Sequence, residues 1–249
     1  MAQTQAKQDE NPLLNILINV IAPVLILAQM SKENDAMWHV GPEKAMYFAL
    51  ALPIAYGAWH FIKTKKLNVF SVVGVLSVLL TGIITIIIWN NESLRPQAAL
   101  LFGIKEAVQP LLLGSLFLIT HKTKSPLFNA FIYNDGIFDV NKIEKKIQSE
   151  DATAEYKQLL WKSTLFFFGS FLISAVLNMF VAYHFLDGLD PDSSTWAQDY
   201  NTGVAKIMGW GFLIIGAPLI VIGGFIFYYL ISGLKRLTSF DLEGLIHPR

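Results

Sequence analysis

The chain alternates between long apolar segments and shorter polar ones. Six apolar segments are long enough to cross a bilayer, because a hydrocarbon core about 30 Å thick needs about 20 residues of helix. They are residues 13–30, 45–62, 67–89, 98–120, 159–185 and 203–234. Since lipid offers no partner to a free backbone N–H or C=O, each segment is expected to be helical. The pattern predicts an all-α fold, a polytopic transmembrane bundle with six spans.

The polar segments between these spans define the expected domain organisation. They give an N-terminal tail (1–12), spans one to four (13–120), a loop (121–158), spans five and six (159–234) and a C-terminal tail (235–249). The first span has a signal peptide as its alternative. It follows Asp9 and Glu10 rather than a basic stretch and has no clear small-residue cleavage site, which favours an uncleaved span.

Basic residues predict the orientation, because Lys and Arg in short loops stay on the cytoplasmic side. One side holds Lys7, Lys63, Lys65, Lys66, Lys122, Lys124, Lys142, Lys145, Lys146, Lys157, Lys162, Lys235, Arg236 and Arg249. The other side holds only Lys32, Lys44, Arg95 and Lys206. Both termini are therefore expected to be cytoplasmic. The loop at 187–201, which contains four aspartates and no basic residue, is expected outside.

The composition agrees with a membrane protein. Of the 249 residues 53% are hydrophobic and 15% are charged, against about a quarter charged in a soluble domain. The 19 basic and 19 acidic residues cancel, so no overall field favours nucleic acid as a partner. The chain has no cysteine, which removes disulfides and thiolate chemistry. The bilayer is the expected partner.

The long loop and the spans carry weaker patterns. In the loop, residues 124–140 fit an interfacial amphipathic stretch, and residues 142–157 predict a solvated helix that continues into span five, with a plain connector as the alternative for either half. The C-terminal segment 239–249 has a similar interfacial composition. Small residues recur along three spans and predict packing seams, with a polar lining as the alternative. These are Gly209, Gly216 and Gly223; Gly74, Ser77, Thr81 and Thr85; and Ser170, Ser174, Asn178 and Ala182.

Span four contains the candidate site. Lys105, Glu106 and Gln109 lie within its apolar run, and Pro110 removes the N–H that would bond to the carbonyl of Glu106. Lys105 and Glu106 point about 100° apart on a helix, so we expect them to pair poorly with each other. Lys105 lies about 10 Å into the span and is expected to extend outward to the interface. Glu106 is deeper and shorter, and an intramembrane carboxyl is a functional hypothesis by default.

Polar residues on other spans are candidate partners for this site. They are Asn15, Asn19, Tyr56, His60, Asn178 and His184. Catalytic chemistry is not indicated, because the sequence has no HExxH, GxSxG or P-loop motif, and its five histidines have no metal-ligand spacing. We therefore expect no enzyme activity, no metal and no cofactor.

The order of features from residue 67 to 234 resembles the intracellular septation protein A (YciB) family. The similarity is carried by a membrane lysine, a basic turn followed by Pro-Leu (HKTKSPLF), a Trp-led span with an asparagine, and NTGVAKIMGWG opening the last span. A related group of bacterial six-span proteins shares GP, LPIAYG and KE. The resemblance implies a bacterial inner-membrane protein that supports envelope integrity or septation, with envelope or division proteins as partners. Lys105, Asn178 and Lys206 match positions where the family carries Lys, Asn and Lys.

Three functions remain open from the sequence. The first is the envelope role, with the polar residues of span four and the cytoplasmic loop as working parts. The second is a small proton- or cation-coupled carrier, acting as a homo-oligomer, in which Lys105, Glu106 and Gln109 form the site and Pro110, Asn19, Asn178 and Lys206 support it. The third is a lipid-binding protein in which Lys105 meets a phosphate. Solvent access to Glu106 distinguishes a carrier from a scaffold.

Overall fold

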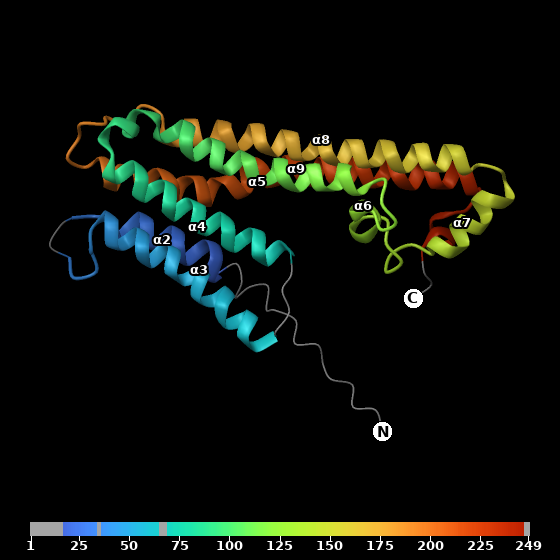
Figure 1. Cartoon of the computed structure of the whole chain (residues 1–249), viewed down its shortest axis with the longest axis horizontal. Coiled ribbons are helices and arrows are strands. Elements are labelled where there is room, and N and C mark those ends of the chain that lie inside the picture. The colour runs from blue at the N-terminus through green and yellow to red at the C-terminus, as the bar shows by residue number, and fades with distance from the viewer. Residues whose placement is uncertain (1–16, 34–35, 65–68, 247–249) are drawn as a thin grey trace, which may run out of the picture. The chain divides into compact units, whose positions relative to one another are not determined.

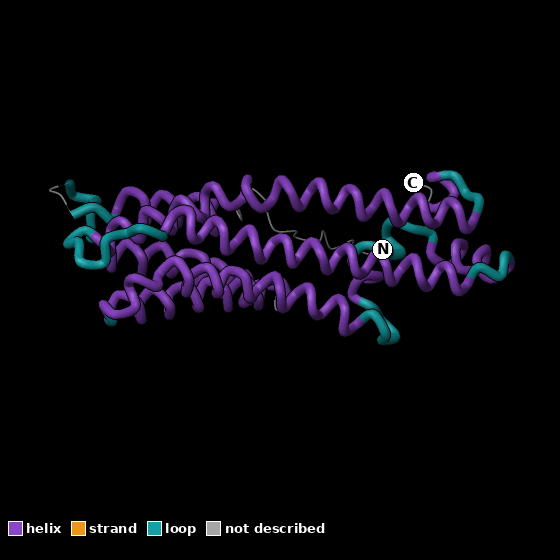
Figure 2. Tube along the Cα trace, turned by 90° about the horizontal axis from the view of Figure 1, so that it is seen from above, coloured by secondary structure: helices purple, strands orange, loops and turns teal. Residues whose placement is uncertain are grey.

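The computed structural model describes residues 17–33, 36–64 and 69–246, and this part of the chain is helical with no strand (Figure 2). The chain divides into two compact units. Unit 1 comprises Met1–Glu106 and Asn178–Leu213, and unit 2 comprises Ala107–Leu177 and Ile214–Arg249. The predicted Asn15 lies outside the described residues.

Unit 1 begins with the first predicted span. It consists of the short α2 (Ala22–Leu25) between two π-helical segments, η1 (Leu17–Ile21) and η2 (Ile26–Met30). Pro23 stands in the first turn of α2 and has no N–H to donate, which matches the widened turn before it. Helices α3 (Pro42–Thr64) and α4 (Val69–Asn90) follow and lie side by side, and the 3₁₀ segment η3 (Glu92–Gln97) leads out of α4 (Figure 1).

Three long helices contribute to both units: α5 (Ala98–Thr120), α8 (Thr153–Leu186) and α9 (Trp196–Thr238). Together with α3, they give four helices long and apolar enough to cross a membrane. The protein is therefore a helical bundle suited to a membrane. Within the described residues, the first predicted span gives the shorter apolar helical stretch Leu17–Met30, and Leu79–Asn90 is an apolar stretch within the 22-residue α4.

Helices α5, α8 and α9 contain the predicted apolar segments, and α8 and α9 extend beyond the ends of those segments. Helix α5 covers residues 98–120 as predicted, whereas α8 begins at Thr153 and α9 extends from Trp196 to Thr238. Both extensions are polar turns that hydropathy alone does not assign to a helix. Their side chains are positioned by packing, as Trp196 and Tyr200 in the first turns of α9 are buried.

The predicted loop folds into a small core in unit 2. Helix α6 (Leu127–Phe131), α7 (Val140–Ser149) and α10 (Leu242–Leu245) join the ends of α8 and α9 there. Phe128, Phe138 and Leu245 are fully buried in this core. The loop meets the C-terminal segment through an antiparallel bridge between Phe138 and Ile246, and the Asp139 N–H donates to the Leu245 carbonyl at 2.9 Å. This segment therefore packs into a core rather than only connecting two helices, and its position at a membrane surface stays a prediction.

The predicted continuous helix from Lys142 into span five is wrong. Asp139 caps α7 by accepting from the Lys142 N–H at 3.1 Å, but α7 ends at Ser149. Asp151 then adopts a positive φ of 52°, which breaks the helix before α8 begins at Thr153. The break lets Ile143 and Ile147 of α7 turn into the core of unit 2.

The predicted glycine seam of span six is also wrong within the described chain. A Cβ built on Gly209, Gly216 or Gly223 meets no atom within 4 Å. The close approaches in α9 are at Gly203 and Gly233 instead, where a Cβ would lie 2.6 Å from Leu186 Cδ2 and 2.3 Å from Leu159 Cδ1 of α8. The serine seam of span five is buried as predicted, since Ser170, Ser174 and Ala182 are all below 10% exposed.

Candidate functional site

Lys105 on α5 is the centre of a polar cluster in unit 1. Its side chain is only 3% exposed, and its Nζ donates to Thr81 Oγ1 of α4 at 2.6 Å and forms a salt bridge with Glu106. The ammonium also lies 5.0 Å from the centre of the Phe102 ring. We call Lys105, Glu106 and Thr81 the Lys105 cluster. The cluster links α5 to α4 through the buried ammonium of Lys105.

Two expectations about this cluster are wrong. Lys105 and Glu106 do pair, and Lys105 does not extend to the interface. The Cβ atoms of adjacent helix residues point in different directions, which keeps short side chains from meeting. The four-carbon stem of Lys105 is long enough for its ammonium to reach the Glu106 carboxylate. Once Glu106 and Thr81 accept from the ammonium, the cation has the partners it would otherwise seek in water.

Glu106 has a different environment from its partner. Its side chain is 23% exposed against 3% for Lys105. The anion thus lies at the edge of the cluster and the cation lies inside it. An adjacent pair of opposite charges is formally neutral, and this lowers the cost of placing either charge in lipid.

The residues around the Lys105 cluster form a buried polar layer that the sequence indicated only in part. The Thr85 and Tyr200 hydroxyls lie 3.4 Å apart, and the Tyr200 ring packs edge-on to Phe102 at 6.5 Å between centroids. The next residue is Asn201, whose Nδ2 donates to Ser31 Oγ at 2.9 Å and to the Pro42 carbonyl at 2.7 Å. The four-residue spacing of Thr81 and Thr85 was a detectable signal. Tyr200 and Asn201 lie in the segment 187–201 that was expected to be an outer loop, so no pairing with membrane helices was predicted for them.

The remaining predicted site residues are distributed along the helices. Gln109 is half-buried and Pro110 is buried, and both belong to unit 2, whereas the Lys105 cluster belongs to unit 1. Asn19 in η1 and Asn178 in α8 are half-buried in unit 1. Lys206 is exposed on α9. The structure therefore brings Thr81 to the predicted Lys105 and Glu106 and places Lys206 on the surface.

Neither a metal site nor a relative adds to this geometry. Within residues 17–33, 36–64 and 69–246 no three His, Asp or Glu side chains are grouped so as to hold a metal ion. No family model, curated protein or solved structure matches the chain. The functional interpretation rests on the contacts of the residues themselves.

Proposed function

We propose that this is a bacterial inner-membrane protein that supports the cell envelope or septation as a scaffold, with the Lys105 cluster as the internal fastening of its bundle. The observation that carries the proposal is the enclosure of the Lys105 ammonium between the Glu106 carboxylate and the Thr81 hydroxyl. A charge enclosed in this way holds two helices in register. It also leaves the lysine inaccessible to a lipid phosphate, which argues against the lipid-binding alternative.

The scaffold role also needs a surface for partners, and the folded core of unit 2 offers one. Its exposed residues include Phe131, Ile137 and Leu242, which project from the segment between α5 and α8 and from the C-terminal segment. The lysine-rich side of the charge count includes this core, so we place it in the cytoplasm with both termini. Division or envelope proteins are the partners that the family resemblance implies.

The carrier alternative has one observation in its favour. Glu106 is 23% exposed, so a proton or cation arriving from that side could compete with Lys105 for the carboxylate. A carrier would expose the Lys105–Glu106 pair to one side of the membrane and then to the other. The scaffold would keep it closed.

The double substitution Lys105→Met with Glu106→Gln separates the two functions, because it removes both charges without leaving one unpaired. The variant is compared with the wild type in a strain that lacks the gene, scored for septation, cell shape and protein level. A scaffold whose cluster only fastens helices should retain its phenotype once the protein level is matched. A folded, normally abundant double variant that fails to restore the phenotype would show that the charges themselves act, and the carrier function would replace the scaffold.

A further inference from the structure

A cleft of about 340 Å³ lies in unit 1, and no residue of the Lys105 cluster lines it. Three connections expected on the same side of the membrane build it: Glu33 together with residues 40–44, the end of α4 with η3, and the start of α9. They are held together by Asn201, which bonds to Ser31 and Pro42, and by Arg95, whose Nη1 donates to the Pro191 carbonyl at 3.0 Å. The cleft is thus assembled from parts distant in sequence.

One wall of the cleft is rich in hydrogen-bond donors. The Arg95 guanidinium lies 5.1 Å from the Trp196 ring centre, and its Nη2 is 3.4 Å from the Glu92 carboxylate. Its Nε and the indole nitrogens of Trp89 and Trp196 are buried and have no hydrogen-bond partner in the described part of the chain. Six buried side-chain atoms lack such a partner there, and half of them belong to this wall. Clustered unpaired donors next to a fixed cation favour an anion.

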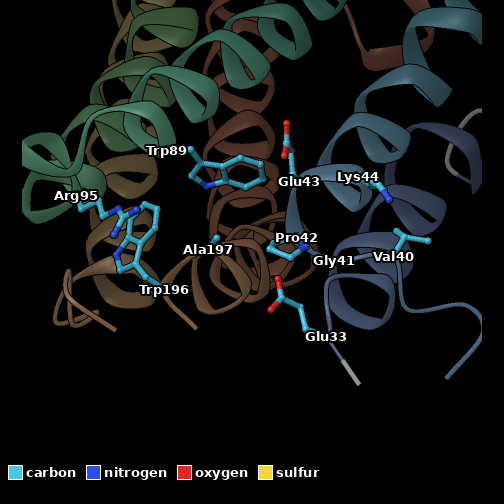
Figure 3. A pocket seen from close by; sticks show the side chains of 10 residues that line it. All are labelled: Glu33, Val40, Gly41, Pro42, Glu43, Lys44, Trp89, Arg95, Trp196 and Ala197. Atoms are coloured by element: carbon cyan, nitrogen blue, oxygen red, sulfur yellow. The ribbon is translucent and has the colours of Figure 1, made fainter. Parts of the chain in front are cut away.

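The opposite wall is acidic. Figure 3 shows Arg95 and Trp196 together on one side of the Trp89 ring, with Glu33, Glu43 and Pro42 on the other. Both carboxylates are exposed, and Glu43 accepts from the Tyr47 hydroxyl at 3.0 Å. Lys44 also lines the cleft, but it lies beyond Glu43 as seen from Trp89. The cleft therefore separates a cation from two anions across an aromatic ring.

We propose that this cleft binds a compact zwitterion, with its anionic group at Arg95 and Trp89 and its ammonium group at Glu33 and Glu43, over the face of the Trp89 ring. An ammonium near an indole face gains a cation–π attraction in addition to the charge pair. The volume suits a molecule the size of an amino acid or of a phosphoethanolamine headgroup. The buried nitrogens contribute to the positive potential of their wall and bond to the anion after a small rotation of the Trp89 and Arg95 side chains. This binding function is separate from the scaffold role.

Two sources supply this chemistry, so two binding measurements are made on the full-length protein. Calorimetry with alanine, acetate and methylammonium tests a free zwitterion against each of its charges alone. Native mass spectrometry from mixed phosphatidylethanolamine and phosphatidylglycerol tests a lipid headgroup. The variants are Arg95→Gln and Glu43→Gln, one on each wall. Glu92→Gln is the matched control, since Glu92 contacts Arg95 but does not line the cleft.

The proposal predicts saturable binding of alanine or selective retention of phosphatidylethanolamine. Arg95→Gln and Glu43→Gln should each weaken this binding about tenfold or more, whereas Glu92→Gln should weaken it by less than about twofold. Acetate and methylammonium should each bind more weakly than alanine. Should Arg95→Gln fail to fold, the exposed Glu43→Gln still decides. Absence of binding to both zwitterions overturns the proposal. So does an affinity for acetate equal to that for alanine, or binding unaffected by Glu43→Gln.

Discussion

Removing Lys105 or Glu106 singly should destabilise the protein far more than removing both. Breaking a buried ion pair by deleting one partner typically costs about 3–5 kcal/mol, because the other charge is left without compensation. Glu106→Met leaves the Lys105 ammonium, only 3% exposed, with Thr81 alone, so we expect a loss near the upper end, about 5 kcal/mol. Lys105→Met leaves the Glu106 carboxylate without its cation, so we expect a loss of at least about 3 kcal/mol.

The double variant Lys105→Met/Glu106→Met tests the pairing itself. Since neither charge remains, its loss should be smaller than that of Glu106→Met alone, and the interaction energy of the cycle should be at least about 2 kcal/mol. Helix content is followed by circular dichroism while the protein in mild detergent is unfolded with a denaturing detergent. Lys206→Met, on the exposed face of α9, is the control and should change stability by less than about 0.5 kcal/mol. Additive single losses would refute the pairing.

Three further predictions concern other parts of the fold. Gly233→Ala should lower the free energy of unfolding by about 1–3 kcal/mol because its Cβ would overlap Leu159. Gly224→Ala, at a position in the same helix where a Cβ meets no atom of the described chain within 4 Å, should raise it by up to about 1 kcal/mol. Thermal unfolding of both variants measures the contrast. Burial, and to a lesser degree the nearby Lys122, lowers the pKa of His121 below its ordinary 6.5. The unfolded chain therefore binds a proton more readily than the folded chain, so the free energy of unfolding should be at its full value above pH 6.5 and fall as the pH drops through the folded pKa. His121→Asn should flatten this pH dependence, and an unchanged slope would contradict the prediction. Leu245→Ala should cost about 2–5 kcal/mol locally and speed hydrogen exchange at the Asp139 amide, while Leu242→Ala, on an exposed side chain, should leave that amide protected.

Hydropathy predicted the parts of the fold that depend on segment length. Helix α5 has the bounds expected from the apolar run, and the apolar runs around α8 and α9 place those helices correctly. The ends of α9 were missed because polar turns join a helix when packing favours it, whereas the first turn of α8 lies within the helix predicted over residues 142–157. Trp196, buried in the first turn of α9, shows this at a position with no apolar run.

The core of unit 2 could not be predicted because its partners are far apart in sequence. Lys142 Nζ donates to the Gly244 carbonyl at 3.0 Å across 102 residues, and Phe138 pairs with Ile246. Short apolar groups such as those in α6 and α10 fit a membrane surface equally well when each is considered alone. These short segments form a core only because they pack against one another in the folded chain.

The candidate site was found from the sequence but its geometry was not. An apolar run interrupted by Lys105 and Glu106 was a sufficient signal for an unusual position. Cβ directions on an ideal helix, however, do not give the path of a lysine stem, and they led to the wrong conclusion about the pair. The glycine stripe of α9 failed for a related reason, because spacing shows which residues share a face and not whether another helix covers that face.

The central claim, that the Lys105 cluster is closed to water, can be tested directly because the chain has no cysteine of its own. Glu106→Cys is made together with Lys105→Met, so that no charge is left unpaired, and Asp192→Cys on the exposed 187–195 connection serves as the reference. The measurement is the rate of modification by a membrane-impermeant thiol reagent applied from both sides of a reconstituted bilayer. The rate at residue 106 should be at least about 100-fold below that at residue 192. Comparable rates at the two positions would reveal an aqueous path to the site and contradict the scaffold.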